Sequence, residues 1–600
     1  MRMRLSDLLT LGVMLVLLLS VGPAIASSYV PCLPGSGGDL KTDAQSPLVV
    51  TIDTSRPRQT IRSVGASDAW STQFVGQWPA ERKEAIADLL FQTGLDDHNN
   101  PRGIGLSAWR FNIGAGSSRQ NNIRDTWRRA DTFLDEAFAG YDWSRCPGQR
   151  WFLQAAKARG VERFIAFVNS PPINMTRNGL AYCSRNSDTT NLRDDRAGDF
   201  AAYLATILRH FRDVEGIDFD GISPFNEPNW DWNDGRQEGC RYSNSDIKRV
   251  VTALYQQLQK QQLRTQIEVV ESGDIGYLYD YPSHRGDYVD AFFDPCSPHY
   301  IGDKVAHRVC AHSYFTCWPE DGRLVGWRQK LRTKLDRYPG LGYAMTEYCI
   351  LTPGGSWVPS KYRGYGNGRS LGMDPALWIA RVIHFDLTVA EASDWQWWLA
   401  VSPYDYKDGL VYVDYAVAEG EHYPSKMLWA LGNFSRFIRP GMKRVVVGRS
   451  DNATDESTAE GLMVSAYWEQ DDDTIVVVFV NRSSQNQYVK LDFAQSGVNS
   501  LIPYVTRGDS SSTDNLTAYK SLAPEDTIAI PARSVVSLVG TTAALGDSGR
   551  SLLSAPEIIG PSRLRSNRAA CKQIRTLFRS NELTCRDGPR PWAQGSPGAK

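Results

Sequence analysis

The order of apolar and polar positions predicts alternating strands and helices through the middle of the chain. Amphipathic segments, with apolar residues three and four positions apart, predict helices at Ala80–Phe91, Arg196–Val214, Ser245–Gln261 and Pro375–Ala390. Short apolar runs around them predict eight strands: Ile61–Ala66, Leu106–Ile113, Arg163–Val168, Ile217–Pro224, Gln266–Glu271, Arg308–Tyr314, Gly342–Cys349 and Asp394–Val401. Eight strand–helix units favour an α/β fold, a parallel (β/α)8 barrel over residues 63–435, with an open doubly wound sheet as the alternative.

A second pattern begins near Ile438, where short runs of alternating apolar residues follow one another without a predicted helix. These runs are Lys443–Val447, Leu462–Trp468, Thr474–Asn481, Gln487–Phe493, Thr527–Ile530 and Ser534–Val539. Such alternation is typical of strands with one buried face, so residues 436–545 are predicted to form an attached antiparallel β-sandwich. The early run Leu48–Asp53 has the same character, and we expect residues 48–62 to join this domain as its N-terminal strand.

Both ends of the chain predict segments outside these two domains. Arg2 and Arg4 precede the apolar run Leu8–Val21, and small residues lead to Ala26, which is typical of a signal peptide covering residues 1–26. An uncleaved anchor is the alternative, although the run is shorter than the roughly 20 residues of a spanning helix. Residues 27–47 indicate a linker, and residues 546–600, basic and poor in apolar residues, a disordered tail. We therefore expect a secreted, extracellular protein.

The composition narrows the choice of partners. The 600 residues carry a formal net charge of -1, which argues against nucleic acid or an anionic membrane, since both select a basic surface. No later stretch is apolar enough to predict stable membrane insertion. The 18 Trp residues favour a polysaccharide or oligosaccharide substrate, because sugars present flat apolar faces to aromatic rings; the alternative is that they fill the core. We expect a monomer.

The cysteines and glycosylation sequons agree with secretion. Ten Cys residues are compatible with disulfides in an oxidising compartment. We expect a disulfide between Cys183 and Cys240, in the loops after strands three and four, a local pair of Cys310 and Cys317, and a free buried thiol at Cys349. No CxxC pair or HExxH run is present, so neither a metal site nor a cofactor is predicted. Acceptor sequons occur at Asn174, Asn433, Asn452, Asn481 and Asn515.

Two segments carry candidate catalytic chemistry, and each ends a predicted strand. Glu227 lies in Ile222-Ser-Pro-Phe-Asn-Glu-Pro-Asn-Trp-Asp-Trp232, after the fourth strand, and Glu347 in Ala344-Met-Thr-Glu-Tyr-Cys349, at the end of the seventh. In a (β/α)8 barrel the carboxyl ends of the strands face one site, and strands four and seven lie nearly opposite each other. One protonated and one ionised carboxyl group beside a bound sugar are what glycoside hydrolysis requires. The alternative is that one or both form ordinary surface ion pairs.

Further segments complete a resemblance to a known family. They are Gly65-Ala-Ser-Asp-Ala-Trp-Ser71, Leu106-Ser-Ala-Trp-Arg-Phe-Asn-Ile-Gly114, His312-Ser-Tyr314 and Ala430-Leu-Gly-Asn-Phe-Ser-Arg-Phe-Ile-Arg-Pro440. With the two catalytic segments, they make residues 48–540 resemble glycoside hydrolase family 30, whose members are retaining hydrolases with a side β-sandwich on the barrel. The run around Glu227, followed by Gln237-Glu-Gly-Cys240, is similar to the endo-β-1,6-galactanase branch of that family.

The resemblance implies roles for the matching residues nearest the reaction. Glu227 matches the acid/base, Glu347 the nucleophile, and Asn226 the asparagine that binds the 2-hydroxyl or the nucleophile side. Arg110, at the end of strand two, is placed to keep Glu347 ionised, because a neighbouring guanidinium favours the charged form of a carboxylate. A purely structural salt bridge is the alternative for Arg110.

Four more residues are expected to shape the site. His312 and Tyr314, which end strand six, are placed to donate hydrogen bonds to Glu347 or to the sugar. Asp68, after strand one, matches a position that binds sugar hydroxyls, and Trp397, on strand eight, matches the aromatic floor under the ring. For His312 the alternative is a core histidine with its hydrogen bonds satisfied.

One departure from the family lies in the loop after strand three, Asn169-Ser-Pro-Pro-Ile-Asn-Met-Thr-Arg-Asn-Gly179. Many relatives carry tryptophans near Asn169 and Asn174, and this loop carries none. The departure counts against a pocket of the glucosylceramide type and favours a more open, polar cleft. A glycan at Asn174 would lie beside that cleft, so we do not expect this sequon to be occupied.

The loop after strand four predicts the substrate. Trp230 and Trp232 alternate with Asp231 and Asp234, and successive sugars each need a stacking face and a hydroxyl acceptor. We therefore expect internal cleavage of β-1,6-galactosyl linkages in plant-type galactan, although both Trp could instead pack against neighbouring loops. Two other functions stay open: the same two-glutamate mechanism on another β-linked glycan, such as β-1,6-glucan, xylan or glucosylceramide, and a catalytically silent carbohydrate-binding protein.

Overall fold

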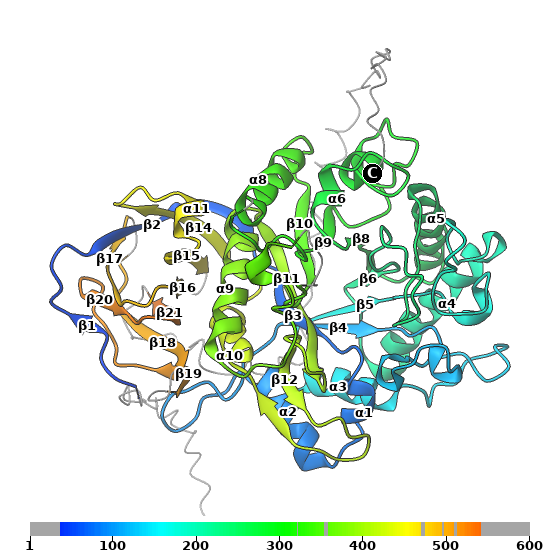
Figure 1. Ribbon diagram of the computed structural model, residues 1–600, viewed down its shortest axis with the longest axis horizontal. Coiled ribbons are helices and arrows are strands. Elements are labelled where there is room, and N and C mark those ends of the chain that lie inside the picture. Colours follow the sequence, from blue (N-terminus) through cyan, green and yellow to red (C-terminus); the bar gives the residue numbers. More distant parts are fainter. Residues whose placement is uncertain are drawn as a thin grey trace, which may run out of the picture.

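The computed structural model describes residues 37–541, apart from residues 321, 353–357, 470–473, 495–496 and 509–512. The expected signal peptide (1–26) and tail (546–600) lie outside these residues. No helix in the described part of the chain combines the length and the apolar character needed to cross a membrane. Two bodies are visible, a helix-covered barrel and a curled sheet that carries both the first and the last described strands (Figure 1).

The barrel consists of parallel strands in chain order: β3 (Ser63–Ser67), β4 (Ala108–Asn112), β5 (Arg163–Phe167), β6 (Gly221–Ser223), β7 (Gln266–Ile267), β8 (Val269–Ser272), β9 (Arg308–His312), β10 (Gly342–Tyr348) and β11 (Ala392–Ser402). Strand β11 pairs with β3, which brings the two ends of the series together. Strands β7 and β8 are two halves of one run; β7 pairs with β6 and β8 with β9, so this run completes the ring. The predicted (β/α)8 fold class is confirmed.

Helices follow the strands and cover the outside of the barrel. The main ones are α2 (Ala80–Phe91), α3 (Pro147–Ala158), α4 (Ala197–His210), α5 (Asn244–Lys260), α7 (Tyr288–Phe293), α8 (Arg323–Leu335), α9 (Met373–Thr388) and α10 (Lys426–Ser435). Helix α5 shows why they form: Ser243 and Asp246 make a capping box at its start. Its buried residues Ile247, Val251 and Leu254 recur at helical spacing, so one face packs on the barrel.

The second domain is one curled sheet of ten strands. In spatial order they are β1 (Lys41–Thr42), β20 (Thr527–Ile530), β17 (Gln487–Phe493), β2 (Leu48–Thr60), β14 (Lys443–Arg449), β15 (Leu462–Glu469), β16 (Thr474–Asn481), β21 (Ser534–Thr541), β18 (Ser500–Gly508) and β19 (Thr513–Ala518). All neighbouring pairs are antiparallel except β2 with β17. A hydrogen-bonded path therefore runs through all ten strands, and the two expected layers of the sandwich are one sheet that curls over itself.

Some details of this domain differ from the sequence expectation. Residues 41–42, within the expected linker, pair with β20, because the buried Leu40 holds this stretch against the sheet. Strands β18 and β19 were not predicted, since Pro503 interrupts the apolar pattern of the first and the second is mostly polar (TDNLTA).

Helix α10 joins the two domains. It lies between the barrel and the curled sheet (Figure 1), and its Asn433 amide donates to the Tyr504 carbonyl and to Ser537 Oγ, at 3.0 Å each. Asn433 has no exposed surface, and neither has Asn481 in β16. Both sequons are therefore inaccessible to a glycan in the folded protein. Asn174 and Asn452 are exposed.

A buried ion cluster fills the barrel at the amino ends of the strands. Glu268, between β7 and β8 and 1% exposed, accepts hydrogen bonds from Arg163 of β5 (2.5 Å) and from Arg308 of β9. Asp394 of β11 lies 3.5 Å from Arg163. Although burial would raise the pKa of Asp394, the charges of Arg163 and Arg308 hold it below its ordinary value. These ion pairs link strands on different sides of the barrel, so they hold the ring together at the end away from the strand C-termini.

Replacing Glu268 tests this cluster. We expect Glu268→Ala to destabilise the barrel by about 3–5 kcal/mol, because two buried guanidinium groups would lose their shared partner. Thermal unfolding followed by circular dichroism measures the effect. The control is Asp336→Ala, which removes an exposed ion pair with Arg332 and should cost less than about 1 kcal/mol. Equal unfolding temperatures for the two variants would contradict the assignment.

Candidate active site

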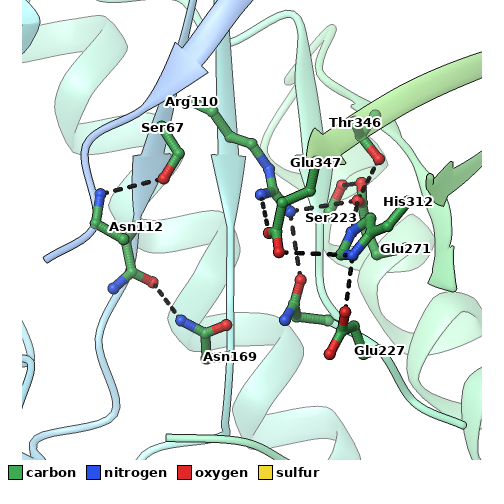
Figure 2. Close-up of polar contacts among 12 residues, drawn as sticks. Ser67, Arg110, Asn112, Asn169, Ser223, Glu227, Glu271, His312, Thr346 and Glu347 are labelled. Atoms are coloured by element: carbon green, nitrogen blue, oxygen red, sulfur yellow. Dashed lines mark hydrogen bonds and ion pairs between the residues drawn. The ribbon is translucent and has the colours of Figure 1, made fainter. Parts of the chain in front are cut away.

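The predicted catalytic residues meet at the carboxyl ends of the barrel strands. Arg110 lies on β4, Glu227 follows β6, His312 ends β9 and Glu347 lies near the end of β10. Glu347 and His312 are direct partners in the β9–β10 register. Figure 2 shows these side chains pointing toward one another from different strands, with a further glutamate, Glu271, behind them. The barrel therefore brings together groups that are up to 237 residues apart in sequence.

The Glu347 carboxylate accepts hydrogen bonds from two neighbouring side chains. Arg110 donates from Nη1 to its Oε2 at 2.6 Å, and the Tyr314 hydroxyl donates to its Oε1 at 3.0 Å. Arg110 is itself 1% exposed, and its guanidinium lies 3.8 Å from the centre of the Phe167 ring. The ion pair and the hydroxyl donor together fix the orientation of the Glu347 carboxylate. Glu347 therefore has the environment that a nucleophile needs.

Glu227 has a different environment. Its Oε1 lies 3.0 Å from Nδ1 of His312, while its Oε2 takes part in none of the contacts drawn in Figure 2. The residue is 7% exposed. Burial raises the pKa of Glu227 above its ordinary value, and the hydrogen bond from His312 opposes this rise only in part. A carboxyl group that keeps its proton and retains some access to solvent is suited to act as an acid.

The backbone at Glu227 is strained and specifically held. Its φ of 45° lies in the left-handed region, which is uncommon for a residue other than glycine. Its N–H donates to the Glu271 carbonyl at 2.7 Å, and its own carbonyl accepts from Trp230 N (3.0 Å) and from Trp232 Nε1 (2.9 Å). Three hydrogen bonds therefore fix the direction in which the side chain leaves the chain. The Trp232 indole N–H is one of these three donors and acceptors, so this side chain helps to hold the Glu227 backbone.

His312 connects the carboxylates. Its ring is completely buried, with Nδ1 3.0 Å from Glu227 and 3.6 Å from Glu347, and Nε2 3.1 Å from Glu271. Although burial alone would lower the pKa of His312, the charge of Glu347 and the hydrogen bonds to Glu227 and Glu271 raise it to about 9. The protonated ring then donates from both nitrogens. The sequence predicts hydrogen bonds from His312 to Glu347 or to the sugar, whereas in the structure they go to Glu227 and Glu271.

Glu271 is the main residue that sequence reasoning missed. It lies on β8, one residue before the end of the strand, and is 1% exposed. It accepts from Ser223 and Thr346 at 2.5 Å each and from Arg110 at 3.3 Å. Although burial would raise the pKa of Glu271, the charge of Arg110 and the hydrogen bond from His312 lower it to about 2. A signal was present, because Glu271 is the last residue of the predicted fifth strand and so had to face the same end of the barrel.

The charges of the site balance when Glu227 is protonated. Arg110 and protonated His312 carry two positive charges, and Glu271 and Glu347 carry two negative ones. Loss of the Glu227 proton leaves one uncompensated negative charge in a buried cluster, which is costly. The arrangement therefore favours the protonated form of Glu227, whose pKa burial raises.

The separation of the two candidate catalytic carboxylates indicates the stereochemical class. A carboxylate oxygen of Glu227 lies within 4.8 Å of one of Glu347. Retaining glycosidases hold their carboxyl groups about 5–5.5 Å apart, and inverting ones about 6.5–9.5 Å apart to leave space for a water molecule. The observed gap belongs to the retaining class.

Asn226 and Asp68 lie deeper than expected. Asn226 is 2% exposed, and its Oδ1 lies 3.5 Å from the Arg110 guanidinium. Asp68 has no exposed surface; it accepts from the Asn112 N–H at 2.8 Å and from the Gln149 amide at 3.2 Å, and burial raises its pKa to about 8. In this arrangement Asp68 holds the loops after β3 and β4 together, and its carboxyl group is not available to a sugar hydroxyl.

The aromatic side chain that faces the site from β11 is Trp398, rather than Trp397. Side chains alternate along a strand, and Trp397 is completely buried, donating to the Asp408 carbonyl at 2.7 Å. Trp398 is 7% exposed. Its ring centre lies 6.3 Å from that of Phe167, the residue that the Arg110 guanidinium stacks on, and 5.2 Å from that of Trp70. The expectation of an aromatic floor at Trp397 is therefore corrected by one residue, because the Trp397 ring packs against Tyr348 and Trp395 on the other face of the strand.

The Gln237–Cys240 segment ties three loops together. Glu238, 1% exposed, accepts from the Ala115 N–H (3.0 Å) and the Ser117 N–H (3.2 Å) of the loop after β4. Gly239 lies under the Trp232 ring, where a Cβ atom would come within 2.3 Å of the indole. Glu238 and Gly239 thus have distinct structural roles next to the acid/base loop.

The thiol of Cys240, the next residue, lies within hydrogen-bonding reach of the Cys183 thiol from the loop after β5. Both are buried free thiols in the structure, so the disulfide between them stays a prediction. Cys310, Cys317 and Cys349 are buried free thiols as well.

Within the described residues, two groups have donor atoms close enough to share a cation: Glu227 with His312 and Glu347, and Glu268 with Glu271 and Cys310. Buried arginines pair with three of these four carboxylates, Arg110 with Glu347 and Glu271, and Arg163 and Arg308 with Glu268; the fourth, Glu227, is paired with His312. These guanidinium groups supply the positive charge that a metal ion would otherwise provide.

Comparison with known families agrees with this geometry. The model of O-glycosyl hydrolase family 30 matches residues 47–412, more than half of the chain. The chain belongs to glycoside hydrolase family 30. The family is a retaining one, in agreement with the carboxylate gap.

Relatives of this family 30 chain include enzymes of several substrates. It is similar to an endo-β-1,6-galactanase from Hypocrea rufa, with 30% identity over 234 residues, which cover 36% of this chain and 47% of that enzyme. The match thus spans about half the length of this curated relative. Among solved structures, a conserved exported protein from Bacteroides fragilis is 33% identical, with a TM-score of 0.73 over 82% of this chain and 100% of that one. A family 30 xylanase C from Talaromyces cellulolyticus, 21% identical with a TM-score of 0.58, covers 82% of this chain and 100% of its own and shares the fold.

The substitution Glu271→Gln tests whether Glu271 sets the charge state of His312 in this family 30 site. We expect kcat/KM to fall about 10- to 100-fold, the equivalent of losing a hydrogen bond between charged groups worth about 1.5–3 kcal/mol. The pKa of His312 should fall as well, because a negative charge that raises it is gone. The pH dependence of kcat/KM should therefore show an ionisation at a lower pH than in the wild type. An unchanged pH profile would contradict this role, and the unfolding temperature serves as the folding control.

Proposed function

We propose that this family 30 chain is a secreted, endo-acting hydrolase of β-1,6-galactosyl linkages, with Glu227 as acid/base and Glu347 as nucleophile. The observation that carries the mechanism is the pair of carboxyl groups within 4.8 Å of each other in opposite electrostatic settings. The similarity to the Hypocrea galactanase supports the linkage. Secretion rests on the signal-peptide pattern at residues 1–26.

In the first step Glu347 attacks the anomeric carbon and forms a glycosyl ester. Glu227 gives its proton to the leaving glycosidic oxygen as that bond breaks. Arg110 and Tyr314 orient the attacking carboxylate, so its reactive oxygen is held before the sugar arrives. The leaving group departs on the side of Glu227.

In the second step a water molecule attacks the same carbon and Glu227 takes up its proton. Ester formation has removed the charge of Glu347, so Arg110 and His312 then face one carboxylate, Glu271, instead of two. The excess positive charge favours loss of the Glu227 proton. The same residue therefore changes from acid to base without any movement of the surrounding groups.

The substrate assignment rests on the loops at the strand ends. The loop after β6 presents Trp230, half-buried, beside Glu227. The loop after β5 lacks the tryptophans of many relatives, and such a loop suits a chain of sugars better than a single apolar aglycone. The same mechanism on β-1,6-glucan or xylan is the second candidate, supported by the fold shared with a xylanase. A catalytically silent binding protein is the third, and the complete set of paired groups around both glutamates counts against it.

The two glutamates are tested with aryl glycosides and azide. Glu347→Ala should abolish turnover, because the ester cannot form. Glu227→Ala should lose about 10²–10⁴-fold on polysaccharide yet retain activity on aryl glycosides whose leaving group needs no proton. Added azide should raise its rate and give a β-glycosyl azide, identified by NMR. Near wild-type activity of both variants on polysaccharide would refute the assignment.

The pH profile provides the control for Glu227. Because its pKa is raised above the ordinary value of 4.5, the acid form persists to higher pH, and activity on polysaccharide should fall as the pH rises through that raised pKa. With an aryl substrate, Glu227→Ala should show no such alkaline limb.

The linkage is tested by a time course on debranched arabinogalactan, β-1,6-glucan and xylan. We expect short β-1,6-galacto-oligosaccharides at the earliest points, separated by anion-exchange chromatography. Release of galactose alone, or faster cleavage of either other polymer, would refute the galactanase assignment and leave the two-glutamate mechanism intact.

A further inference from the structure

Asn169 takes no part in the mechanism above, although it lies at the same end of the barrel as the two glutamates. It comes two residues after Phe167, the last residue of β5. The pairing of β5 with β6 continues past the strand, because the Val168 N–H donates to the Ser223 carbonyl at 3.1 Å. Side chains alternate along such a segment, so Asn169 shares the inward face of Phe167, whose ring contacts the Arg110 guanidinium. Asn169 therefore belongs to the inner wall of the site.

Within the described residues, one end of the Asn169 amide is paired and the other is not. Its Nδ2 donates to Oδ1 of Asn112, at the end of β4, at 3.4 Å. The residue is 2% exposed, yet its Oδ1 has no hydrogen-bond partner in the part of the chain that the structure describes. Figure 2 shows the two amides facing each other, with the Asn169 oxygen turned from Asn112 toward the side of Glu227. A buried carbonyl oxygen is costly to leave unpaired, so this position favours a ligand that donates a hydrogen bond.

Two neighbouring acceptor groups on this wall are already paired. Both carboxyl oxygens of Asp68 accept hydrogen bonds, one from the Asn112 N–H and one from the Gln149 amide. The side-chain oxygen of Asn112 accepts from Asn169 itself. Of these three groups, Asn169 is the one whose oxygen can receive a sugar hydroxyl.

The wall lies on the side of the nucleophile, where the sugar that becomes attached to Glu347 binds. Arg110 donates to Glu347 at 2.6 Å, and its guanidinium lies 3.8 Å from the centre of the Phe167 ring. Contacts therefore lead from Glu347 through Arg110 to Phe167, and Asn169 is set back from the carbon that Glu347 attacks. In a pyranose ring C4 lies opposite that carbon, C1. The Asn169 amide is thus placed for the C4 edge of the sugar.

The orientation of the 4-hydroxyl is what distinguishes galactose from glucose. In galactose it is axial and projects from one face of the ring, which leaves the opposite face apolar for stacking on an aromatic side chain. Trp398 supplies such a ring from β11, and β3 and β4 separate β11 from β5 in the barrel. The ring and the Asn169 amide therefore approach the sugar from different directions. Many relatives carry a tryptophan near Asn169, and the smaller amide leaves room for an axial hydroxyl.

We propose that Asn169 determines the choice of sugar: its Oδ1 accepts a hydrogen bond from the axial 4-hydroxyl of the sugar bound next to Glu347, and so selects galactose over glucose. This inference rests on the proposed function and adds the residue that recognises its sugar. The hydrogen bond to Asn112 holds the amide in the required orientation. Glucose turns its 4-hydroxyl away from this oxygen. The site then discriminates against glucose because the buried acceptor stays unpaired.

The experiment uses aryl glycosides of β-1,6-linked disaccharides that differ only in the sugar next to the aryl group: galactose, glucose, 4-deoxygalactose or 3-deoxygalactose. Wild type should prefer the galactose donor over the glucose and 4-deoxy donors by about 10-fold in kcat/KM, the size expected for one hydrogen bond left unmade. Asn169→Leu, close in size but without an acceptor, should reduce both ratios to about 1 for the same reason. The 3-deoxy ratio should stay as in wild type. Asn169→Asp keeps an acceptor oxygen and should keep the preference for galactose.

The matched control is Asn244→Leu. Asn244 begins α5, outside the site, and is 4% exposed. Its Oδ1 likewise has no hydrogen-bond partner among the described residues. This variant should keep all the donor ratios of wild type. Circular dichroism checks that each variant is folded, and Asn169→Ala takes the place of Asn169→Leu if the latter does not fold.

A galactose preference that survives in Asn169→Leu, or a loss of discrimination at C3 instead of C4, would overturn the assignment and leave the galactanase function intact. A wild type without preference for galactose would instead refute the proposed function. In that case the 4-deoxy donor decides on Asn169, since a penalty found in wild type and absent in Asn169→Leu supports the contact and equal penalties refute it. If no donor is hydrolysed, titration calorimetry with the methyl glycosides of the same disaccharides makes this comparison.

Discussion

A guanidinium buried at 1% exposure must be neutralised, and this requirement at Arg110 organises the carboxyl end of the barrel. Its two ion-pair partners are Glu347 and Glu271, and His312 in turn joins Glu271 to Glu227. The two proposed catalytic glutamates are thus connected through one continuous set of charges. Any change in the charge of one member alters the proton affinity of the others, which is the property that a residue acting as acid and then as base requires.

A second set of buried ion pairs, at the amino ends of the strands, holds the barrel together beneath this site. Paired cations and carboxylates at Glu268, Arg163, Arg308 and Asp394 close the barrel at the opposite end of its strands. The curled sheet packs outside the barrel through α10 and contributes none of the residues paired with the two glutamates. The second domain is joined to the barrel through helix α10, whose Asn433 side chain is hydrogen-bonded to Tyr504 and Ser537 of the curled sheet.

Much of the fold could be predicted because periodicity is a local property. The eight barrel strands and helices such as α2 follow directly from spacing of apolar residues. Glu227 and Glu347 could be found because each ends a predicted strand and a barrel directs such residues to one place. The failures have physical causes. Trp397 was placed on the wrong face because adjacent tryptophans in one strand give no alternation to read, and Asp68 was assigned to the substrate although it binds Asn112 and Gln149 instead.

The sequence by itself determined the fold class, the two glutamates and the arginine that pairs with one of them, since these depend on strand order and on residue type at strand ends. Only the tertiary structure decided the charge state of the site. The raised pKa of Glu227 and the lowered pKa of Glu271 depend on burial and on the distances to Arg110 and His312. Because these residues are far apart in the chain, the distances between them are set only when the barrel closes. Proton affinity is a property of the assembled environment, so it cannot be obtained from the order of residues alone.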